Sequence, residues 1–127
     1  MKKMIVLLKK KEGMPFQEFK DYYEKVHVPL CAEWIGHLIQ DFRRFYPKDL
    51  GNLYRGRPDE ADGRDCGTHY DAIAVYSVKD EDFDELMRIG QNREFQSLIT
   101  EDEERFCDRT ATLEGSAEEF SGLGING

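Results

Sequence analysis

Short apolar runs along the chain predict four β-strands. Residues 3–10 (KMIVLLKK) place apolar side chains between lysines, as in a strand that is buried on both faces. Residues 38–46 (LIQDFRRFY) alternate roughly between apolar and polar side chains, and residues 70–78 (YDAIAVYSV) are β-branched and aromatic. A last short run, residues 109–114 (RTATLE), is the fourth predicted strand.

Two amphipathic stretches between these runs predict helices. Aromatic side chains in residues 16–23 recur at three- and four-residue spacing, which is typical of a helix with one buried face. Proline cannot continue a helix in the usual way, so Pro29 is expected to end this one by about Val28. Asp80 is expected to cap the second helix, and Thr100 to open a short further turn through a capping box.

The order of these elements predicts an α+β fold of the ferredoxin-like type. Strand, helix, strand, strand, helix and strand follow one another, which gives a four-stranded antiparallel sheet with helices on one face. The predicted domain is residues 1–115, with a long charged loop at 47–69 expected to act as a mobile lid, and a Gly-rich tail at 116–127.

The first and third predicted strands carry apolar side chains on both faces. One face packs on the helices, so the other must be covered as well. Two copies that pack their sheets face to face across a two-fold axis would cover it and form a dimeric α+β barrel. We therefore expect a homodimer.

Composition narrows the range of partners. The chain has 127 residues and a formal net charge of −8, and a polyanion needs a basic face, so nucleic acid is not an expected partner. The three cysteines are odd in number and widely spaced, which is typical of reduced thiols in a cytoplasmic protein. The apolar residues near Met1 are too few for a secretory segment or a membrane span, so no membrane contact is expected.

The predicted first helix contains a sequence motif in addition to its helical spacing of aromatic residues. Residues 14–30 (MPFQEFKDYYEKVHVPL) resemble the EthD family, whose pattern runs F-x-x-[YW]-[YW]-x-x-x-H-x-P-L. The matching positions are Phe19, Tyr22, Tyr23, His27, Pro29 and Leu30. Tyr70 with Asp71, and Asp102 with Phe106, are similar to two later markers of the family, so the resemblance extends over residues 3–114.

The resemblance implies a dimeric α+β barrel with a pocket inside each protomer. Similar members in fungal pathways decarboxylate, dehydrate or cyclise polyketides without a cofactor. Other members accompany oxidative degradation pathways. The charged loop at 47–69 and the Gly-rich tail depart from the usual pattern and leave the substrate open.

His27 is the candidate general acid or base, because an imidazole titrates near neutral pH. Asp71 is the one charge in an apolar strand and is expected to orient His27, while the Tyr23 phenol is a candidate donor to an enolate. Each has a plainer alternative. His27 would then bond the last carbonyls of its helix, Asp71 would face water, and Tyr23 would be a core aromatic.

Four further residues are expected to contact substrate: Tyr22, Phe19, Tyr76 and Arg43. The arginine would hold a substrate carboxylate, or else belong to a solvated face of the second strand. Cys66 and His69 form a C-x-x-H with no second pair, so no metal site is assigned. No nucleotide-binding motif is present in the sequence, and the expected cofactor is none.

The sequence and the resemblance together favour a cofactor-independent lyase or cyclase. Its substrate would be a hydrophobic, polyketide-like carbonyl compound, and the shared step would move a proton next to the carbonyl. Two other classes stay open: a non-catalytic protein that binds or assists with a small apolar ligand, and an oxygenase on the same barrel, with or without haem.

Overall fold

The computed structural model describes residues 1–50 and 69–123, so most of the predicted loop lies outside the described residues. The elements of the first half are β1 (Lys2–Leu8), α1 (Phe16–Tyr22), the π-helical segment η1 (Tyr23–His27), α2 (Val28–Ile35), the 3₁₀ turn η2 (Gly36–Leu38) and β2 (Ile39–Phe45). Those of the second half are β3 (Ala72–Val78), the 3₁₀ turn η3 (Asp80–Asp82), α4 (Phe83–Gly90), α5 (Arg93–Phe106) and β4 (Leu113–Ala117).

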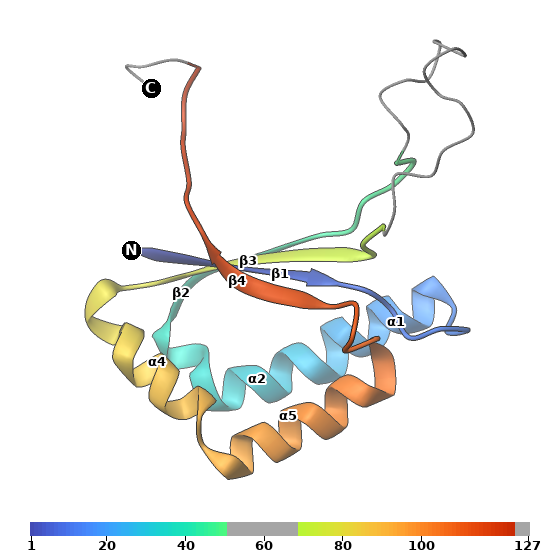
Figure 1. Cartoon of the computed structure of the whole chain (residues 1–127), viewed down its shortest axis with the longest axis horizontal. Coiled ribbons are helices and arrows are strands. Elements are labelled where there is room, and N and C mark those ends of the chain that lie inside the picture. Colours follow the sequence, from blue (N-terminus) through green and yellow to red (C-terminus); the bar gives the residue numbers. More distant parts are fainter. Residues whose placement is uncertain (51–68, 124–127) are drawn as a thin grey trace.

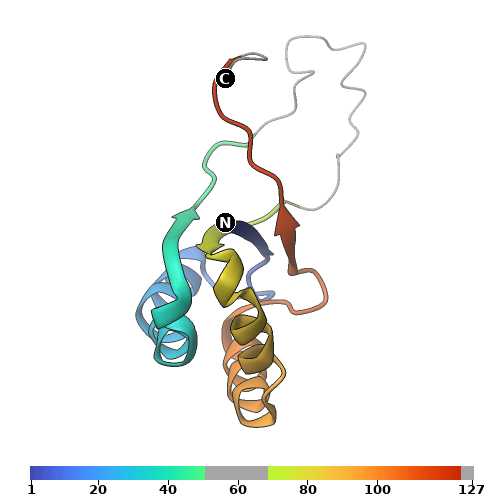
Figure 2. The same cartoon turned by 90° about the vertical axis from the view of Figure 1, so that its left-hand side faces the viewer.

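The four strands form one sheet in the order β2-β3-β1-β4, and every neighbouring pair is antiparallel. This confirms the predicted ferredoxin-like α+β fold. All the helices lie on one side of the sheet, while the segment after β4 rises on the other (Figure 1). The view at right angles shows the same two layers (Figure 2). Among the described residues, no helix is long and apolar enough to cross a membrane.

The side chains between sheet and helices form two separate apolar clusters. One gathers around Phe19, Tyr23 and Phe106, together with Leu8 and Ala72 at one end of the central strands. The other cluster lies at the opposite end of these strands and consists of Leu38, Val78, Leu86 and Ile89. The gap between the two clusters is where the cavity described below opens.

The opposite face of the sheet carries a second apolar surface, which we call the open face. Because Val6, Leu8, Ala74 and Tyr76 face the helices, the alternating residues of β1 and β3 point the other way. Strand pairing aligns Ile5 with Val75 and Leu7 with Ile73, flanked by Phe45 and Leu113, each 52% exposed. The predicted apolar character of both faces is therefore present.

The first helix does not end before Pro29, so that prediction is wrong. The chain continues through η1 into α2 and stops at Ile35. The Val28 N–H bonds the Tyr23 carbonyl, five residues back, and Pro29 falls in the first turn of α2, where a missing N–H costs little. A widened π turn therefore absorbs the proline, and His27 lies within a helix rather than at its C-terminus.

Two further boundaries differ from the prediction. Thr100 opens no new turn, because α5 begins after Asn92, whose side chain accepts a 3.0 Å hydrogen bond from the Phe95 N–H. β4 starts later than residue 109, since Asp108 organises a turn by accepting from the backbone N–H of Thr110 at 3.0 Å. The strand consequently extends into the first residues of the predicted tail, through Ala117.

Candidate functional site

A cavity of about 790 Å³ lies between the sheet and helices α2, α4 and α5. Small residues on its wall leave the space unfilled: Ala32 and Gly36 near the end of α2, Ala74 on β3 and Gly90 on α4. An added Cβ at Gly90 would meet no atom within 4 Å. A volume of this size is typical of sites for small organic ligands.

His27 lies on the wall of this cavity, 8% exposed. Its Nδ1 is 2.8 Å from Oδ2 of Asp102, a carboxylate of α5 that is 2% exposed. The Tyr22 hydroxyl donates to the other oxygen, Oδ1, at 2.5 Å, and Arg105 approaches the same oxygen at 3.4 Å. The carboxylate thus receives hydrogen bonds from three side chains of two helices.

The donors around Asp102 decide which ring nitrogen of His27 carries the proton. Tyr22 and Arg105 both donate to this carboxylate, so we assign the Nδ1 proton of His27 as a third donated hydrogen. The opposite ring nitrogen, Nε2, then carries the lone pair. It lies on the side of Cys31, which also lines the cavity.

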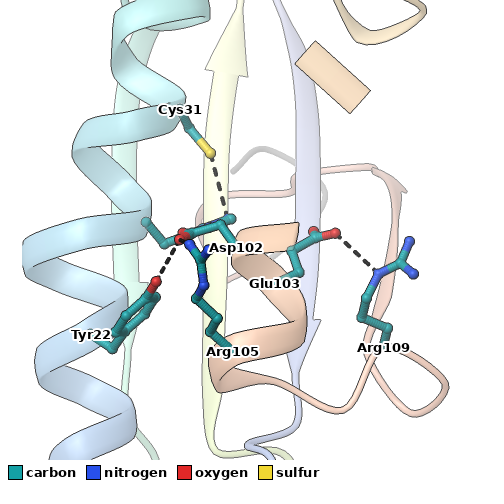
Figure 3. A network of polar contacts seen from close by, with 7 residues as sticks. Tyr22, Cys31, Asp102, Glu103, Arg105 and Arg109 are labelled. Atoms are coloured by element: carbon teal, nitrogen blue, oxygen red, sulfur yellow. Dashed lines mark hydrogen bonds and ion pairs between the residues drawn. The ribbon is translucent and has the colours of Figure 1, made fainter. Parts of the chain in front are cut away.

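The π turn explains how two side chains of one helix reach the same carboxylate. An α turn aligns residues four apart, whereas a π turn brings residues five apart nearly onto one face. Tyr22 and His27 are five apart: Tyr22 precedes the π-helical segment and His27 is its last residue. The wider turn therefore directs both side chains towards Asp102. Figure 3 shows the Tyr22 side chain pointing at this carboxylate.

Cys31 is one α-helical turn beyond His27, with its Sγ 3.5 Å from Nε2. Burial raises the pKa of this thiol to about 12, and the charges of Glu103 and Asp102 add to the effect. The side chain is therefore a neutral thiol at neutral pH rather than a nucleophilic thiolate. Its contact with Nε2 is that of a weak donor.

Aromatic rings fix the position of the imidazole. Phe106 lies 4.8 Å from the His27 ring and 5.7 Å from that of Tyr23, measured between centroids. Tyr23 is 3% exposed, and burial raises the pKa of its phenol. No described residue hydrogen-bonds to the Tyr23 hydroxyl. Every fully buried side-chain oxygen of the described residues has a hydrogen-bond partner, so the Tyr23 oxygen is not fully buried and keeps accessible surface at the cavity.

A second set of charges lines the cavity where α5 and β4 meet. The Arg109 Nε is 3.3 Å from Glu103, whose side chain points away from that of its neighbour Asp102 (Figure 3). Burial raises the pKa of Glu103, while the charges of His27 and Arg109 lower it. In the parts of the chain that the structure describes, no cluster of three or more His, Cys, Asp or Glu side chains could hold a metal ion.

In the structure, the carboxylate beside His27 is that of Asp102 and not that of Asp71. The Asp71 carboxylate accepts a 2.8 Å hydrogen bond from the Lys10 N–H and pairs with Lys9 at 3.7 Å. It lies just before β3 and joins that strand to the end of β1, whereas Asp102 occupies the position behind the imidazole. The expectation that Asp71 orients His27 is therefore corrected.

The other predicted residues divide between cavity and scaffold. Tyr23 and Tyr76 line the cavity, and burial together with the charge of Glu114 raises the pKa of Tyr76 to about 12. Tyr22 reaches Asp102 instead, and Phe19 is fully buried in the apolar core. Arg43 does not line the cavity; it forms an exposed 2.9 Å ion pair with Asp41 on β2.

Asp102 is the site residue that the sequence does not predict. With Phe106 it resembles a marker of the family, but the sequence alone gives it no role. Asp102 and Phe106 are four residues apart on α5, so they share one face of that helix. Because Phe106 packs against His27, and because a buried carboxylate requires a partner, this spacing is the sequence signal for a contact between Asp102 and His27. The partner lies 75 positions away, so only the fold reveals the pair.

A comparison with protein families matches residues 11–110 to the model of the EthD domain. The chain belongs to the EthD family. Among curated proteins, none matches this EthD protein significantly.

Solved structures share the fold of this EthD protein. An EthD family protein from Bacillus halodurans C-125 is 19% identical with a TM-score of 0.57, and the match covers 94% of this chain and 100% of that one. At3g17210 from Arabidopsis thaliana is 12% identical with a TM-score of 0.54, covering 97% and 99%. HapK from Hahella chejuensis is 14% identical with a TM-score of 0.54, covering 98% and 99%. At these identities the likeness extends to the fold alone.

Proposed function

We propose that this EthD protein is a cofactor-independent lyase or cyclase. Its substrate is a hydrophobic, polyketide-like carbonyl compound, and His27 acts as the general acid and base that moves a proton next to the carbonyl. The observation that carries the proposal is the buried 2.8 Å contact between His27 Nδ1 and Asp102 at the cavity wall. A carboxylate behind an imidazole fixes its tautomer and stabilises the imidazolium that forms when Nε2 takes a proton.

The remaining groups of the wall suit the same step. Loss of a proton beside a carbonyl leaves an enolate, which hydrogen-bond donors in a water-poor site stabilise. Tyr23 and Tyr76 keep their phenolic protons at neutral pH, because burial raises both pKa values. Dehydration, decarboxylation and aldol-type cyclisation all pass through such an intermediate.

The open face of the sheet supports the proposal that two copies form a homodimer. Six apolar side chains on all four strands would remain in water in a monomer: Ile5, Leu7, Ile73, Val75, Phe45 and Leu113. Light scattering should show a dimer at micromolar concentration, and Val75→Lys should convert it to monomer. Leu98→Lys, on the outer side of α5, is the matched control and should leave the dimer intact. A monomeric wild-type protein would contradict the proposal.

Exchange of ketone protons for deuterium tests the catalytic role directly. 2-Tetralone is a hydrophobic ketone whose acidic CH₂ group exchanges in D₂O, and NMR follows the exchange. The wild-type protein should accelerate it over buffer, and His27→Gln should lose about 10²–10⁴-fold, the usual contribution of a positioned acid or base. Binding of 2-tetralone should persist, because the substitution removes a proton acceptor rather than the cavity.

Gly90→Leu is the control for the site of exchange. Its side chain would enter the cavity without meeting backbone, so both binding and exchange should be lost together. Folding of each variant is checked by circular dichroism and thermal unfolding. Equal exchange rates for His27→Gln and the wild-type protein would overturn the assignment.

A non-catalytic binding protein is the second candidate. It is favoured by the 3.5 Å contact of Nε2 with the Cys31 thiol, which gives both ring nitrogens a partner within the protein. If this candidate is right, 2-tetralone binds to the wild-type protein and is lost from Gly90→Leu, but no exchange above buffer occurs in either.

A further inference from the structure

The cavity wall carries more negative than positive side chains where it is formed by α5 and β4. Near the junction of α5 and β4, Glu103 and Glu114 line the cavity together with a single cation, Arg109. The guanidinium is already shared, since Arg109 lies 3.3 Å from Glu103 and 3.8 Å from Glu104. Among the described residues, no cation pairs with Glu114.

The Glu114 side chain lines the cavity and is also exposed to solvent. It is on β4, aligned with Val6 on the helix-covered face of the sheet. Its charge is among the causes that raise the pKa values of Tyr76, Cys31 and Glu103, which lie on three different elements around the cavity. The negative potential of this wall thus extends across the cavity.

We propose that the cavity selects neutral, hydroxyl-bearing hydrophobic compounds and disfavours free carboxylates, with Glu114 and Glu103 as acceptors for the ligand hydroxyl. The inference rests on the proposed function, whose ligand class it specifies for the same cavity. A phenol or enol donates to a carboxylate acceptor, whereas a carboxylate ligand would meet like charge, and Arg109, the one Lys or Arg that lines the cavity among the described residues, is already paired.

This preference separates the reactions that share an enolate. Decarboxylation of a free acid requires the substrate to enter as an anion beside Glu114. Dehydration or cyclisation starts from a neutral hydroxy ketone, whose hydroxyl groups can donate hydrogen bonds to the Glu114 and Glu103 carboxylates. Within the proposed function, the wall therefore favours loss of water or ring closure over loss of CO₂.

A pair of matched ligands tests the preference without any catalytic step. 2-Naphthol is neutral at pH 7 and 2-naphthoate is anionic, while their ring systems are the same size. Calorimetric titration at low ionic strength should show 2-naphthol binding about tenfold more tightly, and added salt should narrow the gap. His27→Gln should retain the gap, so this result is independent of whether exchange occurs.

Glu114→Gln removes one negative charge from the wall and should raise the affinity for 2-naphthoate several-fold. Glu101→Gln is the matched control, because it makes the same change on an exposed position of α5 outside the cavity. It should leave both affinities unchanged. The proposal is overturned if 2-naphthoate binds as tightly as 2-naphthol, if neither ligand binds, or if Glu114→Gln leaves the gap as it was.

Discussion

Two carboxylates bond side chains along the helical segment that runs from α1 into α2: Asp102 belongs to α5, whereas Glu24 belongs to the segment itself, and their surroundings differ. Asp102 accepts from Tyr22 and His27 beside the cavity and is 2% exposed. Glu24 accepts from Tyr46 and from two nitrogens of Arg44, at 2.6 and 2.7 Å, where about a quarter of each ionic side chain is exposed. Each cluster joins one carboxylate to a phenol and to a nitrogen-bearing side chain, His27 or Arg44, and the Asp102 cluster has Arg105 in addition.

The nitrogen base is what distinguishes the clusters chemically. A guanidinium keeps its protons under all ordinary conditions, so Arg44 can only hold Glu24 and connect η1 to β2. An imidazole can exchange its proton, and His27 lines the cavity while Glu24, Arg44 and Tyr46 do not. We infer that the Glu24 cluster serves stability and the Asp102 cluster serves chemistry.

Of the carboxylate and phenol substitutions in the two clusters, Asp102→Asn should have the largest effect on the reaction. Asparagine keeps the shape of the side chain but lacks the charge that stabilises an imidazolium, so exchange of 2-tetralone should fall by about 10²-fold. NMR of the exchange reaction measures the rate, and an unchanged rate would contradict the division of roles.

Glu24→Gln should lower the stability of the protein without slowing the exchange reaction. Loss of the carboxylate leaves the partly buried Arg44 without its bidentate partner, which should lower the free energy of unfolding by about 1 kcal/mol. Exchange activity should be unaffected, since the residue lies away from the cavity. Glu85→Gln, which breaks the more exposed ion pair with Arg88, is the matched control and should change stability less in urea unfolding. Loss of exchange in Glu24→Gln would contradict the distinction.

The Glu24 cluster also predicts a dependence of stability on acid pH. The Arg44 hydrogen bond lowers the pKa of Glu24 below its ordinary value of 4.5. The unfolded chain therefore binds the proton first, and the contribution of the cluster is present above that value and lost as pH falls through the folded-state pKa. Urea unfolding between about pH 5 and pH 3 should lose stability more steeply in the wild-type protein than in Glu24→Gln. Parallel slopes would contradict the prediction.

The sequence was sufficient to predict the fold because its local signals agreed. β1 and β3 had clear apolar runs, and the apolar character of both their faces indicated a sheet with a second surface to cover. The helix boundary at Pro29 was wrong because a proline in the first turn after a π segment loses no bond that the helix needs. Such an accommodation depends on tertiary packing.

The site could be predicted only in part. His27 and Tyr23 line the cavity as expected, because the helix motif fixes their spacing within one element. The choice between Asp71 and Asp102 required knowing which strand end and which helix face meet His27, and that information is not local. A charge within an apolar run attracted attention, whereas the functional contact came from an acid among many acids in α5.

Tyr22→Phe should slow exchange far less than Asp102→Asn and tests how much the Asp102 cluster depends on the phenol. The substitution keeps the ring that stacks on Phe106 at 5.4 Å and removes only the hydroxyl that donates to Oδ1. Arg105 lies 3.4 Å from the same oxygen and can take over part of that role, so Asp102 does not lose every donor on that side. We expect the free energy of unfolding to fall by about 0.5–1.5 kcal/mol, the usual net value of one hydrogen bond, and exchange to slow only a few-fold. Tyr46→Phe removes the corresponding phenol from Glu24 and should affect stability alone. If the two phenylalanine variants had the same effect on exchange, the phenols would not distinguish the clusters, and the contrast would rest on His27 and Arg44 only.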